Sequence, residues 1–353
     1  MTRYTSLLTG IHPLSESLIK HIFDFKYGRV SSPNIVQKAF KQDIENLITI
    51  MKDIYPQAVS TGNLGWWDIF RPFTEALLRQ KNGEKTSNLP VARIPLTNTF
   101  YRQPQIDTKF QHDTSILKAT KHPFLEGNIL QTKLLPDSLR ENAWSICLPG
   151  PYTFSRAANI DTKSPTSYKS ENEMMYDFTE ILKEEIKVLT AEGFSHIILD
   201  EGGLVWESLD NEIIEAIEEN WTNLGEAVSP RLAVHTYYSL EPHLLELLAN
   251  TKVWGIGIDC VRNKVASLAD YDFDSKVLIA GVVDAQAYFR SPSGNLVVEE
   301  IKDLVETGEM LAETTADQII LAPTSRLEFI PRSVADLKIQ ALGHTIKRLE
   351  EQV

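Results

Sequence analysis

HIILDE (His196–Glu201) decides the fold, because a short apolar run ends there on two carboxylates. Seven other runs have a similar form, and most of them end at a glycine, a carboxylate or a hydroxyl. These runs are TSLLTG (residues 5–10), AVSTG (58–62), WSICLPG (144–150), LAVHTY (232–237), GIGID (255–259), LIAGVVD (278–284) and IILAPTS (319–325). Amphipathic stretches such as 173–190 and 242–250 separate the runs, which is the strand-helix alternation of a parallel sheet. Eight such units predict a single (β/α)8 TIM-type barrel, one domain over residues 1–353.

The spacing of the runs is uneven at one place. The second predicted strand lies near residues 57–62, whereas the third begins only at about Trp144. The sequence therefore predicts an insertion between strands 2 and 3, over approximately residues 63–143. A barrel with an insertion of this size remains compatible with one domain of 353 residues.

Composition excludes several classes of partner. The formal net charge is -13, and an acidic chain lacks the basic face that nucleic acids and anionic membranes require. The sequence has neither a long apolar stretch nor the charged and apolar succession of a signal peptide. We expect a cytoplasmic protein with small-molecule ligands. The two cysteines, Cys147 and Cys260, have no paired spacing, so the sequence indicates neither a disulfide framework nor a thiolate-rich metal site.

The strand ends supply the candidates for chemistry, because the carboxyl ends of barrel strands face the active site. The candidates are Asp200, Glu201, His235, Asp259, Asp284 and Ser325. Side chains alternate along a strand, so His235 and Tyr237 share one face. On the next strand the glycines place Asp259 inward and Cys260 outward. An inward histidine of this kind is more often a hydrogen-bonded structural group than a ligand.

The insertion combines aromatic and cationic residues, and two interpretations stay open. The residues are Trp66, Trp67, Asp68, Arg71, Phe73, Arg93, Asn98, Phe100, Tyr101 and Arg102. As a binding face they would stack a flat ring and pair with carboxylates. The structural alternative, favoured for each residue taken singly, is that the aromatics pack the insertion and that Asp68 and Arg71 form a local pair.

Seven segments in order carry a resemblance to a known family. They are NTFYRQP (98–104), LPGPYTFS (148–155), IILDEGG (197–203), HTYYS (235–239), GIGIDCV (255–261), GVVDA (281–285) and APTSRLEFIPRSVADLK (322–338). Together they resemble the cobalamin-independent methionine synthase family, whose barrels are of the methionine synthase and uroporphyrinogen decarboxylase kind. Several segments are more similar to its N-terminal barrel, which lacks zinc ligands, than to its catalytic barrel.

The resemblance implies a zinc-activated homocysteine thiolate that attacks a methyl donor. In the family pattern a His-x-Cys pair, a Glu and a second Cys bind the zinc. Carried onto this chain, these positions are His235, Tyr237, Asp259 and Ser325, so three of the four ligands are altered. Neither a tyrosine nor a serine hydroxyl is substantially ionised near neutral pH, and both are harder than sulfur. Zinc is possible but doubtful, and we assign no metal ligand.

The resemblance also implies roles for the strand-end residues. Asp200 and Glu201 would bind the amino group of the thiol substrate or a pterin N–H. His235 and Asp259 would line the thiol site, and Asp284 would orient His235 or relay a proton. The remaining substrate-binding candidates are Asn98, Tyr101, Tyr237 and Ser325.

Two functions follow as expectations. The first is methyl transfer from a folate or corrinoid donor to homocysteine or a similar thiol. The alternative is a non-catalytic barrel that binds the methyl donor and works with a separate zinc-bearing methionine synthase barrel. The altered thiolate positions favour the alternative, whereas the retained carboxylates Asp200 and Glu201 favour the enzyme.

Overall fold

The predicted eight-stranded sheet is present. The computed structural model describes residues 4–66, 68–70, 72–74, 105–110, 112, 115–119, 143–206, 208–227, 231–273 and 275–352. Its sheet strands are β1 (Tyr4–Ser6), β2 (Val59–Ser60), β4 (Trp144–Pro149), β6 (Phe194–Asp200), β7 (Arg231–His235), β8 (Gly255–Asp259), β9 (Val277–Val283) and β12 (Gln318–Pro323). They are all parallel, in the order β1-β12-β9-β8-β7-β6-β4-β2. Each of the eight apolar runs therefore overlaps one strand.

Backbone contacts between the first strand and the approach to the second close the sheet into a barrel. Ser6 forms a parallel bridge with Pro56. The Ser6 amide donates to the Tyr55 carbonyl at 2.9 Å, and the Gln57 amide donates to the Ser6 carbonyl at 2.8 Å. The two edge strands thus satisfy their backbone groups against each other, and the (β/α)8 prediction is confirmed.

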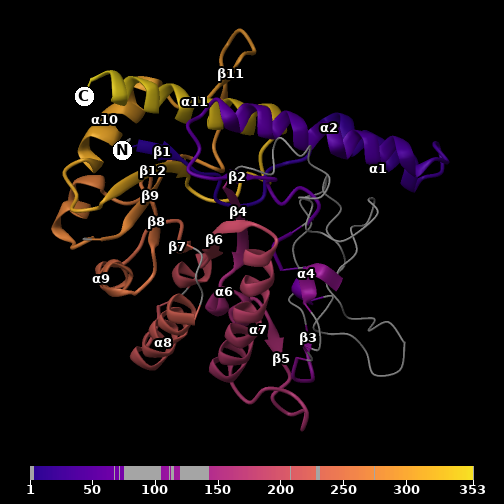
Figure 1. Cartoon of the computed structure of the whole chain (residues 1–353), viewed down its shortest axis with the longest axis vertical. Helices are drawn as coiled ribbons and strands as arrows, with labels where there is room; N and C mark the ends of the chain where they lie inside the picture. The colour runs from indigo at the N-terminus through magenta and orange to yellow at the C-terminus, as the bar shows by residue number, and fades with distance from the viewer. Residues whose placement is uncertain are drawn as a thin grey trace.

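Helices cover the outside of the sheet (Figure 1). They are α1 (Glu16–Lys26), α2 (Pro33–Lys52), α6 (Pro151–Arg156), α7 (Glu171–Ala191), α8 (Asn211–Ala227), α9 (Pro242–Asn250), α10 (Ile301–Leu311) and α11 (Arg332–Glu351). Serine side chains cap three of them by accepting a backbone N–H of the first turn: Ser15 on α1, Ser32 on α2 and Ser170 on α7. The outward apolar residues of β8, Ile256 and Ile258, are fully buried beneath this layer.

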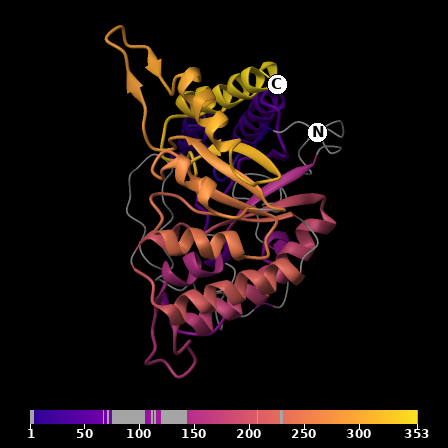
Figure 2. The ribbon, with the colours of Figure 1, turned by 90° about the vertical axis from the view of Figure 1, so that its left-hand side faces the viewer.

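Two connections differ from a simple strand-helix repeat. Between β8 and β9 the chain forms only a 3-10 helix, η3 (Val265–Asp270). After β9 a β-hairpin of β10 (Phe289–Arg290) and β11 (Leu296–Val297) precedes α10 and projects from the barrel (Figure 2). The sequence analysis did not predict this hairpin, because each strand has only two residues and no apolar run marks it.

The described parts of the insertion pack against α7 and the segment before it. Strand β3 (Gln105–Ile106) pairs with β5 (Asn159–Ile160), and α4 (Ile116–Ala119) follows. Trp66 and Phe73 are buried in edge contact with each other, with 6.3 Å between ring centroids. These two aromatics therefore pack the core, as the structural alternative predicted. Among the described residues no helix is long and apolar enough to cross a bilayer.

Candidate active site at the barrel mouth

Several of the predicted residues meet at the carboxyl end of the sheet. The strand register aligns Asp200 with His235 and His235 with Gly257, and residues in register on parallel strands point to the same face. Tyr237 follows β7, and Ser325 and Arg326 follow β12. The mouth of the barrel thus brings together Asp200, His235, Tyr237 and Arg326, although Arg326 was not among the candidates.

His235 is held in a neutral form inside the barrel. Its imidazole lies over Gly257, where a Cβ would come within 2.2 Å of the ring Cδ2. The side chain is 1% exposed, and Nε2 is buried without a hydrogen-bond partner. Burial lowers the pKa of His235 to about 4 because desolvation penalises the cation. The Nε2 atom of the neutral ring is therefore unpaired. A histidine at such a position is more usually a hydrogen-bonded structural group.

Asp200 forms the centre of a buried polar cluster. Its Oδ2 lies 3.4 Å from Nε of Arg326, and the Tyr237 hydroxyl donates to the same carboxylate. Tyr237 packs flat against Gly202, because a Cβ there would overlap the ring. Burial raises the pKa of Asp200, an effect that Arg326 opposes. The same carboxylate accepts the Gly202 amide at 3.4 Å, so Arg326, Tyr237 and the Gly202 backbone hold it at the barrel mouth.

Glu201, the neighbouring carboxylate, is fully occupied by protein donors. Its oxygens accept the Tyr152 and Thr153 amides at 3.2 and 2.8 Å, the Thr153 hydroxyl at 2.7 Å and the Trp221 indole N–H at 3.0 Å. Burial raises the pKa of Glu201 to about 7, while these donors lower it. Gly150 leaves room for the side chain. The geometry therefore makes Glu201 an anchor for the first turn of α6.

Asp259 and Asp284 belong to a separate ion network around Arg262. The Asp259 oxygens accept the amides of Tyr238, Val261 and Arg262, each at 3.0 Å. The Arg262 guanidinium donates to Asp259 at 3.0 Å and to both Asp284 oxygens at 2.9 and 3.1 Å. Asp284 thus pairs with Arg262, and no hydrogen bond joins it to His235. This network links the loops after β7, β8 and β9, and the sequence analysis missed Arg262 although it lies three residues beyond Asp259.

Asn63 is a second residue that the sequence analysis did not assign to the site. It follows β2 with a left-handed backbone, φ 47°. Its Nδ2 donates to the Cys147 carbonyl at 2.8 Å, whereas Oδ1 is buried without a hydrogen-bond partner. The amide is thus fixed by one end and presents an unpaired acceptor at the other. The only signal in the sequence was its place directly after a strand-end glycine.

The donor set does not fit the zinc site that the resemblance implies. Within the described residues no three His, Cys, Asp or Glu side chains lie close enough to hold a metal ion. Asp259 already accepts four hydrogen bonds, and burial raises the pKa of Tyr237. Cys260 donates to the Ile258 carbonyl, and burial raises its pKa to about 12. Metal ligation at these positions would require several of these groups to change their partners or protonation.

Two predicted substrate-binding residues, Asn98 and Tyr101, lie outside the described residues, as do Trp67, Arg71, Arg93, Phe100 and Arg102. Ser325 is 9% exposed at the end of β12. A groove of about 220 Å³ lies beside the mouth, between the loops after β6 and β7. Leu204, Leu209 and Leu244 line it together with Ser239, Glu241 and His243.

A family model described as the cobalamin-independent synthase, N-terminal domain, matches residues 97–307, more than half of the chain. The chain belongs to this family. The match confirms the resemblance carried by the strand-end segments, several of which lie within the matched residues.

Named relatives extend the similarity beyond the matched residues. The "methionine synthase" of Saccharolobus islandicus strain Y.G.57.14 is 24% identical over 346 residues, which cover 98% of this chain and 94% of the relative. The "5-methyltetrahydropteroyltriglutamate--homocysteine methyltransferase" of Pasteurella multocida is 31% identical over 159 residues, or 45% of this chain. The matched segment spans only 20% of that second relative.

Solved structures support the fold. A B12-independent methionine synthase from Shewanella sp. W3-18-1, in complex with selenomethionine, superimposes with a TM-score of 0.69 at 15% identity. The alignment covers 100% of this chain and 98% of that one. A methyltransferase from Methanosarcina mazei gives a TM-score of 0.62 at 11% identity. At these identities the likeness establishes the barrel architecture alone.

Proposed function

We propose that this chain is a methyltransferase that moves a methyl group from a folate or corrinoid donor to homocysteine or a similar thiol. Family membership and the names of the relatives support this proposal. The single observation that carries it is the buried cluster of Asp200, Tyr237 and Arg326 beside the unpaired imidazole of His235. Such convergent polar groups at strand ends are typical of binding sites in this fold.

The residues at the mouth have separate tasks in this reaction. Asp200 binds the amino group of the thiol substrate or a pterin N–H through its buried carboxylate beside Arg326. The Nε2 atom of His235 accepts a hydrogen bond from the substrate thiol. When the sulfur–carbon bond forms and the bond from carbon to the donor breaks, the electron pair of that bond stays on the donor. The thiol proton must leave the sulfur in the same step.

Removal of this proton is the difficult part for the chain alone. The pKa of His235 is about 4, and a free thiol has a pKa of about 8.5. Full transfer of the proton to the imidazole would therefore cost about 6 kcal/mol. This mismatch favours a second candidate function, in which the barrel binds the methyl donor and a separate zinc-bearing barrel activates the thiol. Glu201 and Asp259, whose oxygens accept only protein donors, support that candidate.

A turnover experiment separates the two candidates. Purified chain is incubated with homocysteine and a triglutamylated methyltetrahydropteroyl donor, and methionine is measured by mass spectrometry while donor binding is measured by calorimetry. The enzyme proposal predicts methionine formation, reduced about 10- to 100-fold by Asp200→Asn because a charge-assisted hydrogen bond is lost. Asp210→Asn, an exposed residue outside the site, is the matched control.

The other outcomes are equally informative. Donor binding without methionine, followed by turnover when a zinc-bearing methionine synthase barrel is added, would establish the second candidate. A chain that binds neither donor nor thiol contradicts both candidates. Turnover that Asp200→Asn leaves unchanged would establish the activity and contradict the role proposed for Asp200.

A further inference from the structure

The helical hairpin of α1 and α2 carries a positive tip on an acidic protein. Residues 20–41 contain five basic side chains and one acidic side chain, Asp24, although the whole chain has a net charge of -13. The basic residues are Lys20, Lys26, Arg29, Lys38 and Lys41, all of them exposed. Figure 1 shows this hairpin extending beyond the barrel, so its far end is available to another molecule.

An aromatic ring lies at the centre of the tip. Tyr27 follows the last residue of α1 and is 60% exposed. Its ring stacks on Phe23 with 5.7 Å between centroids, and the charged groups of Lys26 and Arg29 each lie 6.0 Å from its centroid. Tyrosine and arginine are enriched where protein interfaces are strongest. An exposed tyrosine between cations therefore fits an acidic protein surface.

The chain itself provides such a surface on α8. This helix contains five glutamates and neither lysine nor arginine. All five, Glu212, Glu215, Glu218, Glu219 and Glu226, are exposed. Within the described residues two of them accept side-chain hydrogen bonds: Glu219 from the Tyr176 hydroxyl and Glu226 from the Lys252 ammonium. Like charges one turn apart destabilise a helix slightly, and a cationic partner would relieve this repulsion.

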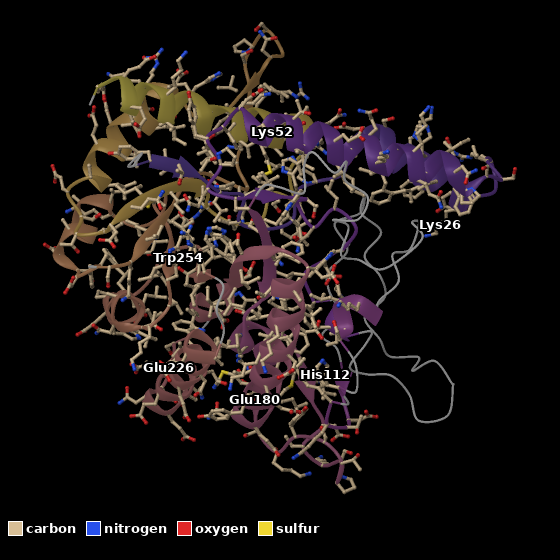
Figure 3. The ribbon with its side chains drawn as sticks, in the orientation of Figure 1. Lys26, Lys52, His112, Glu180, Glu226 and Trp254 are labelled. Atoms are coloured by element: carbon tan, nitrogen blue, oxygen red, sulfur yellow. The ribbon has the colours of Figure 1, made fainter. Side chains whose placement is uncertain are left out.

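We propose that the α1–α2 tip docks on the α8 face of a second copy of this chain. The opposite charges of the two surfaces support this choice of partner. The docking proposal does not depend on the proposed function. Lys26 and Glu226 lie at opposite sides of the molecule (Figure 3), so one copy cannot join its own two surfaces. A head-to-tail contact leaves a free tip and a free α8 face after each pairing. Association therefore continues beyond a dimer and depends on concentration.

Ionic strength distinguishes this contact from an apolar one. Exposed ion pairs each strengthen binding by up to about fivefold, and they are screened over about 3 Å at 1 M salt. The mean molecular mass of the purified full chain is measured by sedimentation equilibrium against protein concentration. It is expected to rise with concentration at about 20 mM salt and to return to the monomer value at about 0.5 M.

Charge reversal in two variants provides the decisive test. One variant carries Lys26→Glu and Arg29→Glu, and the other carries Glu215→Lys and Glu218→Lys. Each variant alone is expected to be monomeric at low salt, because the substituted surface keeps little or no net charge: three basic against three acidic side chains at the tip, or three glutamates against two lysines on α8. A mixture of the two regains association as far as a dimer, since the unaltered tip of one variant meets the unaltered α8 face of the other. A control with Lys302→Glu and Lys347→Glu, exposed on α10 and α11, associates as the wild type does.

Several results would overturn the proposal. They are a wild-type chain that stays monomeric at low salt, association that survives either reversal, and a mixture that remains monomeric. Equal loss of association in the control would show that net charge matters and that the tip does not. Thermal unfolding of each variant, expected within a few degrees of the wild type, verifies that these surface changes leave the fold intact.

Discussion

His235 is a buried imidazole without a hydrogen-bond partner on Nε2, and its cost to the fold depends on pH. Below its own pKa the ring must bind a proton in a buried site, where desolvation penalises the cation. An unpaired buried group of this kind lowers the free energy of unfolding, and strained or unpaired groups cluster at functional sites. We therefore propose that a ligand of the barrel mouth binds at this imidazole.

The pH dependence of unfolding tests this description of His235. The pKa of His235 is about 4 in the folded chain and about 6.5 in an unfolded one. Between these values the unfolded state binds more protons, so the free energy of unfolding falls as the pH decreases. From about pH 7 to pH 5 the wild type should lose about 2 kcal/mol more than His235→Gln, measured by urea denaturation. His344→Gln, an exposed control on α11, should follow the wild type, and equal slopes for all three proteins would contradict the assignment.

At the residue scale the sequence predicted positions better than contacts. The placement of Asp200 and His235 at inward strand ends follows from the period of two along a strand, and the register confirms that they are neighbours. The partners of Glu201 were not predictable, because Thr153 and Trp221 come from helices 48 and 20 residues away. Arg262 and Arg326 were missed for a related reason, since a cation next to a strand-end acid carries no periodic signal.

At the element scale, α7 holds part of the insertion through one buried carboxylate. Glu185 of α7 accepts the Ile116 and Leu117 amides at 2.6 and 3.2 Å. It also accepts the Ser115 hydroxyl and the His112 ring nitrogen, each at 3.0 Å. The amides belong to the first turn of α4, where a negative charge is favourable. This carboxylate ties the chain before β4 to the outer layer of the barrel.

Removal of that carboxylate should loosen α4. Glu185→Gln replaces one acceptor oxygen by an amide donor that faces N–H groups, which should reduce the free energy of unfolding by about 2–4 kcal/mol. Hydrogen exchange at the Ile116 and Leu117 amides should accelerate. Glu184→Gln is the matched control, because Glu184 is exposed and pairs only with Lys187, and it should cost less than about 0.5 kcal/mol. Unchanged exchange at both amides would exclude this role for Glu185.

Helices and strands within an apolar run or an amphipathic stretch were predictable at this scale, and short elements outside such a pattern were not. The stretch 242–250 was expected to be amphipathic and forms α9 with those bounds, and the stretch 173–190 lies within α7, Glu171–Ala191. The two-residue strands of the β10–β11 hairpin and the 3-10 helix η3 have too few residues to show a period. The predicted insertion, approximately residues 63–143, rests on the spacing of the strands, and its boundaries remain a prediction.

For the whole molecule, the sheet is one continuous structure that includes strands from both ends of the chain. Strand β12 lies between β1 and β9, so the first and last parts of the sequence share hydrogen bonds. No described segment of the sheet can be removed without exposing two new edges. We therefore propose that residues 1–353 form a single folding unit.

Calorimetry tests whether the chain is a single folding unit. Heating should give one transition with equal calorimetric and van't Hoff enthalpies, as expected for a cooperative domain. A chain ending at residue 315 lacks β12 and α11, and it should show no cooperative transition because β1 and β9 lose their common neighbour. Two resolved transitions in the full chain would show that the insertion folds separately from the barrel. A cooperative transition in the shortened chain would show that the barrel folds without its last unit.

The pairing of β1 with β12 also has a consequence for biosynthesis. Tyr4 pairs with Ile319, so the first strand leaves the ribosome long before its neighbour is made. At about 5–20 residues per second the interval is roughly 15–60 s, during which the edge of β1 has no native strand on that side. A nascent chain in this state exposes a template for wrong pairing. We therefore expect β1 to reach its native pairing only after translation has passed residue 323.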